Sequence, residues 1–393
     1  MHTRLLFLLF IFFSSDITSA QQLLWKFKTG NRVYSSAAID SALIFIGSGD
    51  SNVYALNHQT GRLQWTFKTN GAVHSTPFVY RDVILVSSSD GSVHALNKLT
   101  GKSKWTFSPG KEKIYDLWDY YISSPIVYNN SVYWGSGDGY VYSINLANGK
   151  KQWAYKTGDV VHATPLLDSN RLYIGSFDGH LYCLNAQNGK LNWKFKTIGD
   201  TYFPKGEIQT SAALHNGAIY FGSRDYNIYS LNAINGTGHW NMKEKGSWII
   251  ATPLVHLENI YFGTSDSHRF YAMGIAAGED RWHMKLNMRV FGSAAAKDST
   301  IYFGCFNGKL YGVNAFNGQV NFVFQTDGSR HNYNNIFDNN DNFVEGFTTY
   351  GDNYIEAEKQ LHTLGSILST PLIHDNTIYF GSSDGNVYAV KLN

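Results

Sequence analysis

Short apolar stretches separated by turn residues recur along the chain from residue 23 onward. Apolar and polar positions alternate within many of them, as in "VYALN" and "LQWTF", and few stretches are long enough for a helix. Asp-Gly and Asn-Gly pairs, which favour tight turns between antiparallel strands, stand between the stretches. The pattern predicts an all-β protein built from many short strands.

The stretches belong to a repeat that fills the chain. A strand end of the type "IYFGSxD" occurs eight times, from "IFIGSGD" to "IYFGSSD". An aromatic residue recurs at intervals of 40 to 48 residues, with a Gly four residues before it from the second copy onward. The aromatic positions are Trp25, Trp65, Trp105, Trp153, Trp193, Trp240, Trp282 and Phe322. An Asp stands in the strand-end motif of seven copies: Asp50, Asp90, Asp138, Asp178, Asp225, Asp266 and Asp384. We interpret this Asp as a turn residue, with calcium binding as the alternative.

Each repeat contains four short strands: A with small residues, B apolar, C of the type "VYALN", and D with the repeat aromatic. Four-stranded units at this period predict a β-propeller, here with eight blades. The eighth repeat has no strand D after "VYAVKLN", and "LLWKFK" at 23–28 precedes the first strand A. We therefore expect the N-terminal strand to pair with the last blade and close the ring.

Composition narrows the functional classes. Aromatic and charged residues each make up 16% of the chain, and the net charge is +2 without a basic block, so no nucleic-acid partner is predicted. Residues 1–20 have the n-region, apolar core and small cleavage residues of a signal peptide, with cleavage near Ala20. We expect residues 21–393 to form one exported propeller, periplasmic or secreted, monomeric and without a transmembrane segment. Cys183 and Cys305 lie far from the cleavage site, so no lipid anchor is predicted.

The order Trp, S-x-P, G-S-x-D-G, V-Y-A-L-N and T-G-x-x-x-W resembles the PQQ-like repeat over residues 23–393. That repeat builds eight-bladed propellers in quinoprotein dehydrogenases and in the outer-membrane assembly factor BamB family. The resemblance implies either a scaffold in envelope assembly or an enzyme that uses pyrroloquinoline quinone (PQQ) with calcium. It does not decide between them, because the repeat residues belong to the scaffold.

The start of each strand A should line the axial channel. The predicted positions contain no carboxylate, Lys or Arg: Tyr34, His74, Ile122, His162, Gln209, Ile250, Phe291 and Leu368. A quinone enzyme needs a carboxylate base and oxygen ligands for calcium there. His74, His162 and the nearby Trp248 are weak candidates for holding a cofactor, and no metal site and no catalytic residue is predicted.

Three D-to-A connections are longer than the others, at about 109–122, 198–210 and 328–366. Because strands alternate in direction, all three inserts should lie on one face, together with the B–C turns. They carry the aromatic residues expected to form an interaction face: Tyr115, Trp118, Tyr120, Tyr121, Tyr202, Phe203, Phe337, Phe343, Phe347 and Tyr350. Aromatic loops on a rigid scaffold are typical of binding surfaces, although these side chains could instead pack together and plug the channel.

The sequence therefore favours a non-catalytic exported scaffold that binds a protein or peptide partner, such as an outer-membrane protein, on the face with the inserts, with no cofactor. The first alternative is a PQQ- or quinone-dependent dehydrogenase, in which Asp338, Asp341 or Glu345 would fold inward and supply carboxylates. The second is a glycan-binding propeller, because Tyr and Trp rings suit sugar rings.

Overall fold

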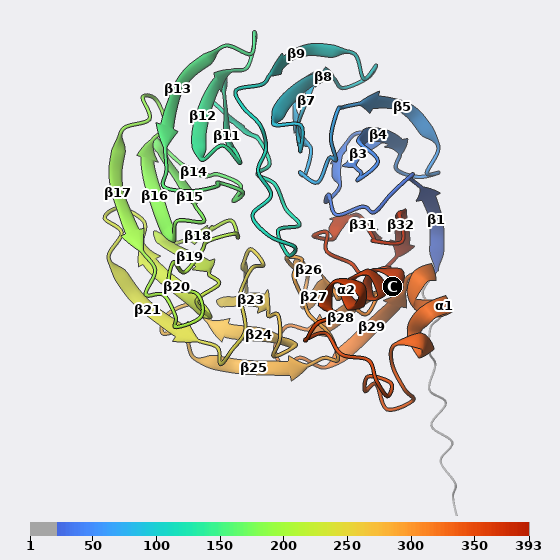
Figure 1. Cartoon of the computed structure of the whole chain (residues 1–393). Helices are drawn as coiled ribbons and strands as arrows, with labels where there is room; N and C mark the ends of the chain where they lie inside the picture. The colour runs from blue at the N-terminus through green and yellow to red at the C-terminus, as the bar shows by residue number, and fades with distance from the viewer. Residues whose placement is uncertain (1–21, 393) are drawn as a thin grey trace, which may run out of the picture.

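The computed structural model describes residues 22–392, which form eight four-stranded antiparallel sheets arranged around a central axis (Figure 1). The expected signal peptide lies outside the described residues. In each sheet the strand nearest the axis is the short strand A, and strand D lies at the outside. The prediction of an eight-bladed β-propeller is confirmed.

The first four blades follow the chain in the order A, B, C, D. Blade 1 contains β2 (Ala38–Asp40), β3 (Leu43–Gly47), β4 (Asn52–Asn57) and β5 (Leu63–Lys68). Blade 2 contains β6 (Phe78–Tyr80), β7 (Val83–Ser88), β8 (Ser92–Asn97) and β9 (Ser103–Phe107). Blade 3 contains β10 (Ile126–Tyr128), β11 (Ser131–Gly135), β12 (Tyr140–Asn145) and β13 (Lys151–Lys156). Blade 4 contains β14 (Leu166–Asp168), β15 (Arg171–Gly175), β16 (His180–Asn185) and β17 (Leu191–Lys196).

The next three blades repeat this order. Blade 5 contains β18 (Ala213–His215), β19 (Ala218–Gly222), β20 (Asn227–Asn232) and β21 (Gly238–Lys243). Blade 6 contains β22 (Leu254–His256), β23 (Asn259–Gly263), β24 (Arg269–Gly274) and β25 (Asp280–Lys285). Blade 7 contains β26 (Ala295–Lys297), β27 (Thr300–Gly304), β28 (Lys309–Asn314) and β29 (Val320–Gln325).

The eighth blade joins the two ends of the chain. It contains β30 (Leu372–His374), β31 (Thr377–Gly381), β32 (Asn386–Lys391) and, as its strand D, β1 (Leu23–Lys28). Strand β1 runs antiparallel to β32, with Trp25 opposite Ala389 and Lys28 opposite Asn386. This pairing covers the edge that β32 would otherwise expose, and it confirms the predicted closure.

The repeat Trp residues form hydrogen bonds between neighbouring blades. Each of the seven indole N–H groups donates to a carbonyl in the C–D turn of the following blade, at 2.8–3.3 Å. Phe322 is the exception, and it faces the last blade, whose strands C and D come from opposite chain ends and have no C–D turn between them. An indole donor would lack its usual acceptor at this boundary, which explains a Phe there.

The Gly before each repeat aromatic lies against the Trp of the preceding blade. At Gly101, a Cβ atom would lie 2.6 Å from Trp65 Cε3, and the backbone φ is +68°. Gly217 has a similar φ of +76°, but nothing lies within 4 Å of the position its Cβ would take. The two positions therefore differ mainly in the space available to a side chain.

We expect Gly101→Ala to destabilise the fold more than Gly217→Ala. Both substitutions place Ala at positive φ, at a cost of about 1–2 kcal/mol each. Gly101→Ala should lose about 1–3 kcal/mol more, because its methyl group overpacks against Trp65. Denaturant unfolding of both variants measures the difference, and equal losses would show that the Trp–Gly contact does not fasten the blades.

The third insert contains the only helices among residues 22–392. These are α1 (Asp327–Asn332), the 3-10 turn η1 (Tyr333–Asn335) and α2 (Tyr354–Thr363), with an isolated bridge between Phe337 and Phe343. No helix in residues 22–392 is long and apolar enough to cross a membrane. Leu361 of helix α2 and Leu364, directly after the helix, are buried in the core near the axis, so the insert is part of the folded structure.

Candidate functional site

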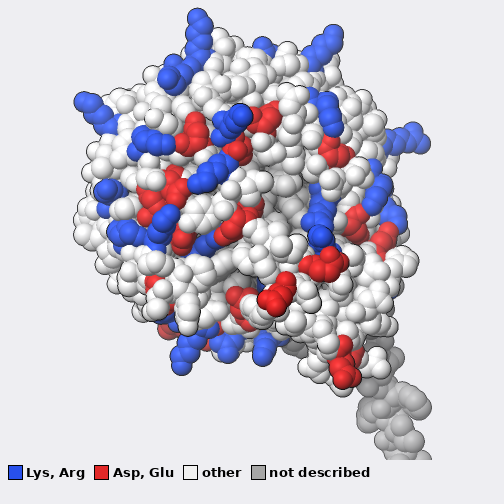
Figure 2. All heavy atoms as spheres, viewed as in Figure 1, with Lys and Arg blue, Asp and Glu red and all other residues white. Residues whose placement is uncertain are grey.

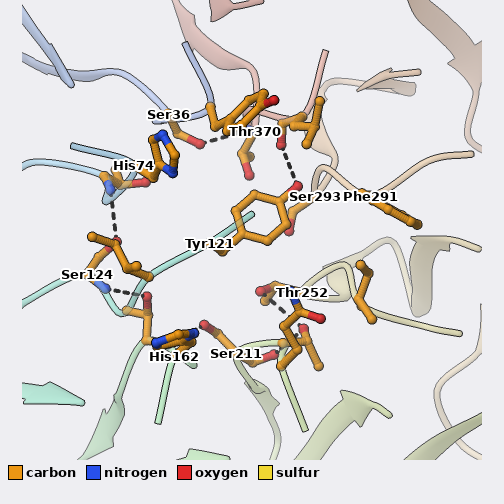
Figure 3. Close-up of a pocket in the computed structure, with 18 residues that line it drawn as sticks. Ser36, His74, Tyr121, Ser124, His162, Ser211, Thr252, Phe291, Ser293 and Thr370 are labelled. Atoms are coloured by element: carbon orange, nitrogen blue, oxygen red, sulfur yellow. Dashed lines mark hydrogen bonds between the residues drawn. The ribbon is translucent and has the colours of Figure 1, made fainter. Parts of the chain in front are cut away.

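The first insert runs from the outside of blade 2 to the centre of the ring (Figure 1). At the axis, the Tyr121 hydroxyl donates to the Leu368 carbonyl at 2.9 Å, and its ring lies across the channel (Figure 3). Tyr120, beside it, is buried against Tyr34, Phe291 and Phe306. These two aromatic side chains close the channel on the face with the inserts.

The channel cavity beneath Tyr121 has a volume of roughly 110 Å³. It is lined by all eight side chains that the sequence placed around the axis, together with small Ser and Thr residues (Figure 3). Pockets for cofactors and drug-sized ligands have volumes of about 300–1,000 Å³. The channel therefore has room for water and small solutes rather than for a cofactor.

His162 and His74 both line this channel, but their pKa values are shifted in opposite directions. His162 Nδ1 lies 2.9 Å from Asp119 and its Nε2 lies 2.6 Å from Glu112, and all three side chains are buried. Burial opposes charging of His162, but the two carboxylates outweigh it and raise the pKa to about 9. Burial lowers the pKa of His74 to about 4, so its ring is neutral at pH 7.

The residues that line the channel cavity include no carboxylate, but the sequence did not indicate the carboxylates that lie next to this lining. Strand A supplies none, but the first insert folds Glu112 and Asp119 onto His162, and helix α2 brings Glu358 to the axis. Asp338, Asp341 and Glu345, which the enzyme alternative required to fold inward, are all exposed. Asp338 instead accepts backbone N–H groups within its own turn, and Asp341 accepts from the Tyr333 hydroxyl at 2.7 Å.

Two buried arginines fix the inserts to the blades. Arg224 pairs with Asp116 of the first insert and donates to Gln209 Oε1 at 2.8 Å, while its guanidinium lies 4.4 Å from the Trp248 ring centre. Arg289 donates to Glu358 of helix α2 at 2.9 Å. The Tyr120 hydroxyl donates to the other oxygen of Glu358, so these contacts join the first and third inserts.

The second insert is joined to the first as well. The Tyr115 hydroxyl donates to Glu207 at 3.1 Å, and the Gln209 side chain donates to the Trp118 carbonyl at 3.1 Å. Lys205 of the second insert also forms an ion pair with Asp159, in the connection between blades 3 and 4, at 2.9 Å. All three inserts thus meet in a single cap on the face that carries the D–A and B–C connections. We call this face the insert face. Figure 2 shows acidic and basic side chains mixed over the molecule in the view of Figure 1.

The inserts surround a pocket of roughly 640 Å³, which we call the aromatic pocket. Its aromatic lining is Trp118, Tyr202, Phe203, Tyr226, Trp248, Phe291, Tyr350 and Tyr354. Several of these rings are in contact, and Phe203 and Trp118 meet Trp248 edge-to-face at centroid distances of 5.0 and 5.8 Å. Asp116, Asp266 and Arg289 supply the charged groups of the lining. A mostly apolar pocket with a few convergent polar groups is the usual form of a ligand site.

The structure separates the ten residues expected on the interaction face. Tyr202, Phe203, Trp118 and Tyr350 line the aromatic pocket, and Tyr202 is 80% exposed. The other expected residues lie elsewhere: Tyr115 packs against Phe177, Tyr120 and Tyr121 close the channel, and Phe343 packs between Phe337 and Phe347. Tyr120 and Phe337 are buried, so they support the insert face rather than form its surface.

The residues do not fit a calcium-bound quinone. The channel is smaller than such a ligand needs, and among residues 22–392 no three His, Cys, Asp or Glu side chains are grouped so that they could hold a metal ion. In the aromatic pocket, Trp248 could serve as a platform, but one side of its ring is occupied by Arg224. We therefore derive no redox step for this site.

A protein-family model described as outer membrane protein assembly factor BamB matches residues 16–202 and 178–393. The chain belongs to this family. No curated protein matches the sequence. BamB from Moraxella catarrhalis has a similar solved structure, at 14% identity and a TM-score of 0.70, over 95% of this chain and all of that one.

Other solved structures share the fold at comparable similarity. Quinohemoprotein alcohol dehydrogenase from Comamonas testosteroni is 12% identical with a TM-score of 0.71, over 94% of this chain and 76% of that one. Sqt1 from Saccharomyces cerevisiae is 14% identical with a TM-score of 0.71, over 95% of this chain and all of that one. At these identities the likeness concerns the fold alone, and function has to be argued from the site.

Proposed function

We propose that this member of the BamB family is a non-catalytic scaffold of the periplasm that binds a protein partner, an outer-membrane protein or a peptide segment of one, on its insert face. The observation that carries the proposal is the convergence of three separate inserts on one aromatic pocket. The family's description as an outer membrane protein assembly factor supports this class of partner.

The construction of the pocket favours recognition of a partner over catalysis. The charged groups beneath it are paired with one another: Arg224 with Asp116, and Arg289 with Glu358. His162, buried at the channel mouth, is held between two carboxylates, and both of its ring nitrogens have a partner. Exposed Tyr and other aromatic side chains on a rigid base are the residue types that dominate binding energy at protein interfaces.

Photo-crosslinking tests the position of the binding face. A photoreactive phenylalanine at Tyr202 or Tyr350, 80% and 59% exposed on the insert face, should form an adduct with an outer-membrane protein in living cells. The control position is Leu99, which is 72% exposed in the C–D turn of blade 2, on the opposite face. Mass spectrometry identifies the adduct.

We further expect Tyr350→Ser to weaken binding of the identified partner by about tenfold or more, as is typical of a central aromatic contact. This residue is exposed, so the substitution should leave the unfolding transition in place. Adducts from Leu99 alone, or full binding by the Tyr350→Ser variant, would contradict the proposal.

A further inference from the structure

The acidic side chains at the aromatic pocket are more exposed than the basic ones. The carboxylates of Asp116 and Asp266 are 30% and 35% exposed, whereas the side chains of Arg224 and Arg289 are 1% and 5% exposed. A ligand in the pocket therefore meets mainly carboxylate oxygens and ring faces, because Arg224 lies beneath the surface and Arg289, although it lines the pocket, is almost fully covered. Counting Glu358, three carboxylates oppose two guanidinium groups, so this set of groups carries one net negative charge.

Asp266 supplies the unbalanced charge because the B–C turn of blade 6 differs from the others. Six residues lie between the strand-B Gly and the strand-C Tyr in blade 1, Gly47 and Tyr54, but seven lie between Gly263 and Tyr271 in blade 6. In the regular turn, Asp50 accepts the Asn52 backbone N–H at 2.9 Å and the Tyr54 hydroxyl at 2.6 Å. The extra residue moves Asp266 away from both roles.

Other side chains replace Asp266 within its own blade. The Tyr271 hydroxyl donates to Glu244, and the Arg269 backbone N–H, which corresponds to that of Asn52, donates to Thr264 Oγ1 at 2.8 Å. Asp266 itself accepts from Ser265 Oγ at 3.1 Å and lies beside the Tyr350 hydroxyl, with Arg289 Nε 3.9 Å away. A carboxylate has about four acceptor sites, so Asp266 keeps capacity for a further donor that enters from the pocket.

The protein's own Arg224 already places a guanidinium group against the inner side of this pocket. Arg224 lies 4.4 Å from the centre of the Trp248 ring, and its two terminal nitrogens donate to Asp116. A flat, delocalised cation stacked on an aromatic ring and paired with a carboxylate is a stable combination in a partly desolvated site. On its open side the pocket offers the same groups again, with Asp266 as the carboxylate and Trp118, Phe203 and Tyr350 as rings.

We propose that the aromatic pocket binds the side chain of an arginine presented by the partner, with Asp266 as its counter-ion. This inference rests on the proposed function, because it specifies what part of the partner enters the pocket. It predicts that the pocket prefers Arg over other side chains, and this preference can be tested without the partner itself.

The test uses short peptides of defined charge. Acetyl-Gly-Arg-Gly-amide is compared with its citrulline analogue, which has the shape of Arg without the charge, and with its Lys analogue. Binding is followed by the indole N–H signals of Trp118 and Trp248 in NMR spectra, assigned with Trp→Phe variants. We expect the Arg peptide to bind about tenfold or more tightly than the citrulline peptide, since cation–π contact and ion pairing both require the charge.

Asp266→Asn should remove this preference, whereas Glu345→Gln should preserve it. Glu345 is exposed in the third insert and does not line the pocket, so its substitution makes the same charge change as a control. Equal binding of the Arg and citrulline peptides, equal binding of the Arg and Lys peptides, or an unchanged preference in Asp266→Asn would each overturn the assignment. Adducts at Tyr202 would still support the docking face in those cases, whereas Arg binding without any adduct would reject the docking role.

Discussion

Replacing Glu358 by Ala should destabilise the protein by about 3–5 kcal/mol, the cost typical of removing one partner from a buried ion pair. Glu358 and Arg289 side chains are 6% and 5% exposed, and their nitrogen–oxygen distance is 2.9 Å. The substitution leaves the Arg289 charge buried next to Phe291 and Phe306 with only the more distant Asp266 to balance it. It also removes the acceptor of the buried Tyr120 hydroxyl.

Denaturant unfolding gives the loss directly, and helix α2 provides a matched control. Glu356 is on the same helix but pairs with Lys359 at 3.4 Å, with both side chains more than 60% exposed, so Glu356→Ala should cost less than about 1 kcal/mol. The double substitution Arg289→Met with Glu358→Leu should recover most of the stability, because no buried charge remains. A loss below 1 kcal/mol for Glu358→Ala would mean that the third insert is not held to the blades by this pair.

Point substitutions test the role of the third insert better than its deletion would. Ile336, Phe337, Leu361 and Leu364 of this insert belong to the same buried cluster as Phe291 and Phe306 near the axis. Deleting the insert would expose that cluster, and the resulting loss of binding would not distinguish a missing contact from a damaged core. Point substitutions at exposed positions such as Tyr350 separate the two effects.

The propeller could be predicted from the sequence because each repeated residue has a local role that recurs in every blade. The repeat Trp donates to the next C–D turn, and the repeat Gly leaves room for its ring. The repeat Asp caps its own B–C turn, as Asp50 does. Landmarks of this kind are visible in one sequence, and the closing strand follows from their order.

The contacts of the cap could not be predicted in the same way, because none of them repeats. Tyr120 and Glu358 are 238 residues apart, and Asp116 and Arg224 are 108 residues apart. Their pairing depends on how three irregular inserts cross the ring, which no local pattern specifies. Two signals were nevertheless present in the sequence: the Arg in "IYFGSRD", where other copies have small or apolar residues, and the extra residue between Gly263 and Tyr271.

The stability of the folded protein should also depend strongly on pH through His162. The pKa of His162 is raised to about 9 in the folded protein, against about 6.5 for an exposed His, so the folded state binds the proton more tightly. Its contribution to stability is therefore complete below about pH 6.5 and is lost as the pH rises through 9. The difference of about 2.5 pKa units corresponds to a contribution on the order of 3 kcal/mol at pH 6.5. His162→Gln should remove this pH dependence.

Unfolding free energies at pH 6.5 and pH 9, compared between the wild type and His162→Gln, isolate the effect of this one ring. The buried, neutral His74 and His362, whose pKa values are lowered to about 4 and about 3, destabilise the fold only below pH 6.5 and so do not interfere. His331→Gln, at an exposed position on α1, serves as the control and should keep the wild-type slope. If the unfolding free energies of the wild type and His162→Gln differ by the same amount at both pH values, His162 is not charged in the folded protein. Asp119 and Glu112 would then have to share a proton instead, since they approach the same ring within 2.9 and 2.6 Å.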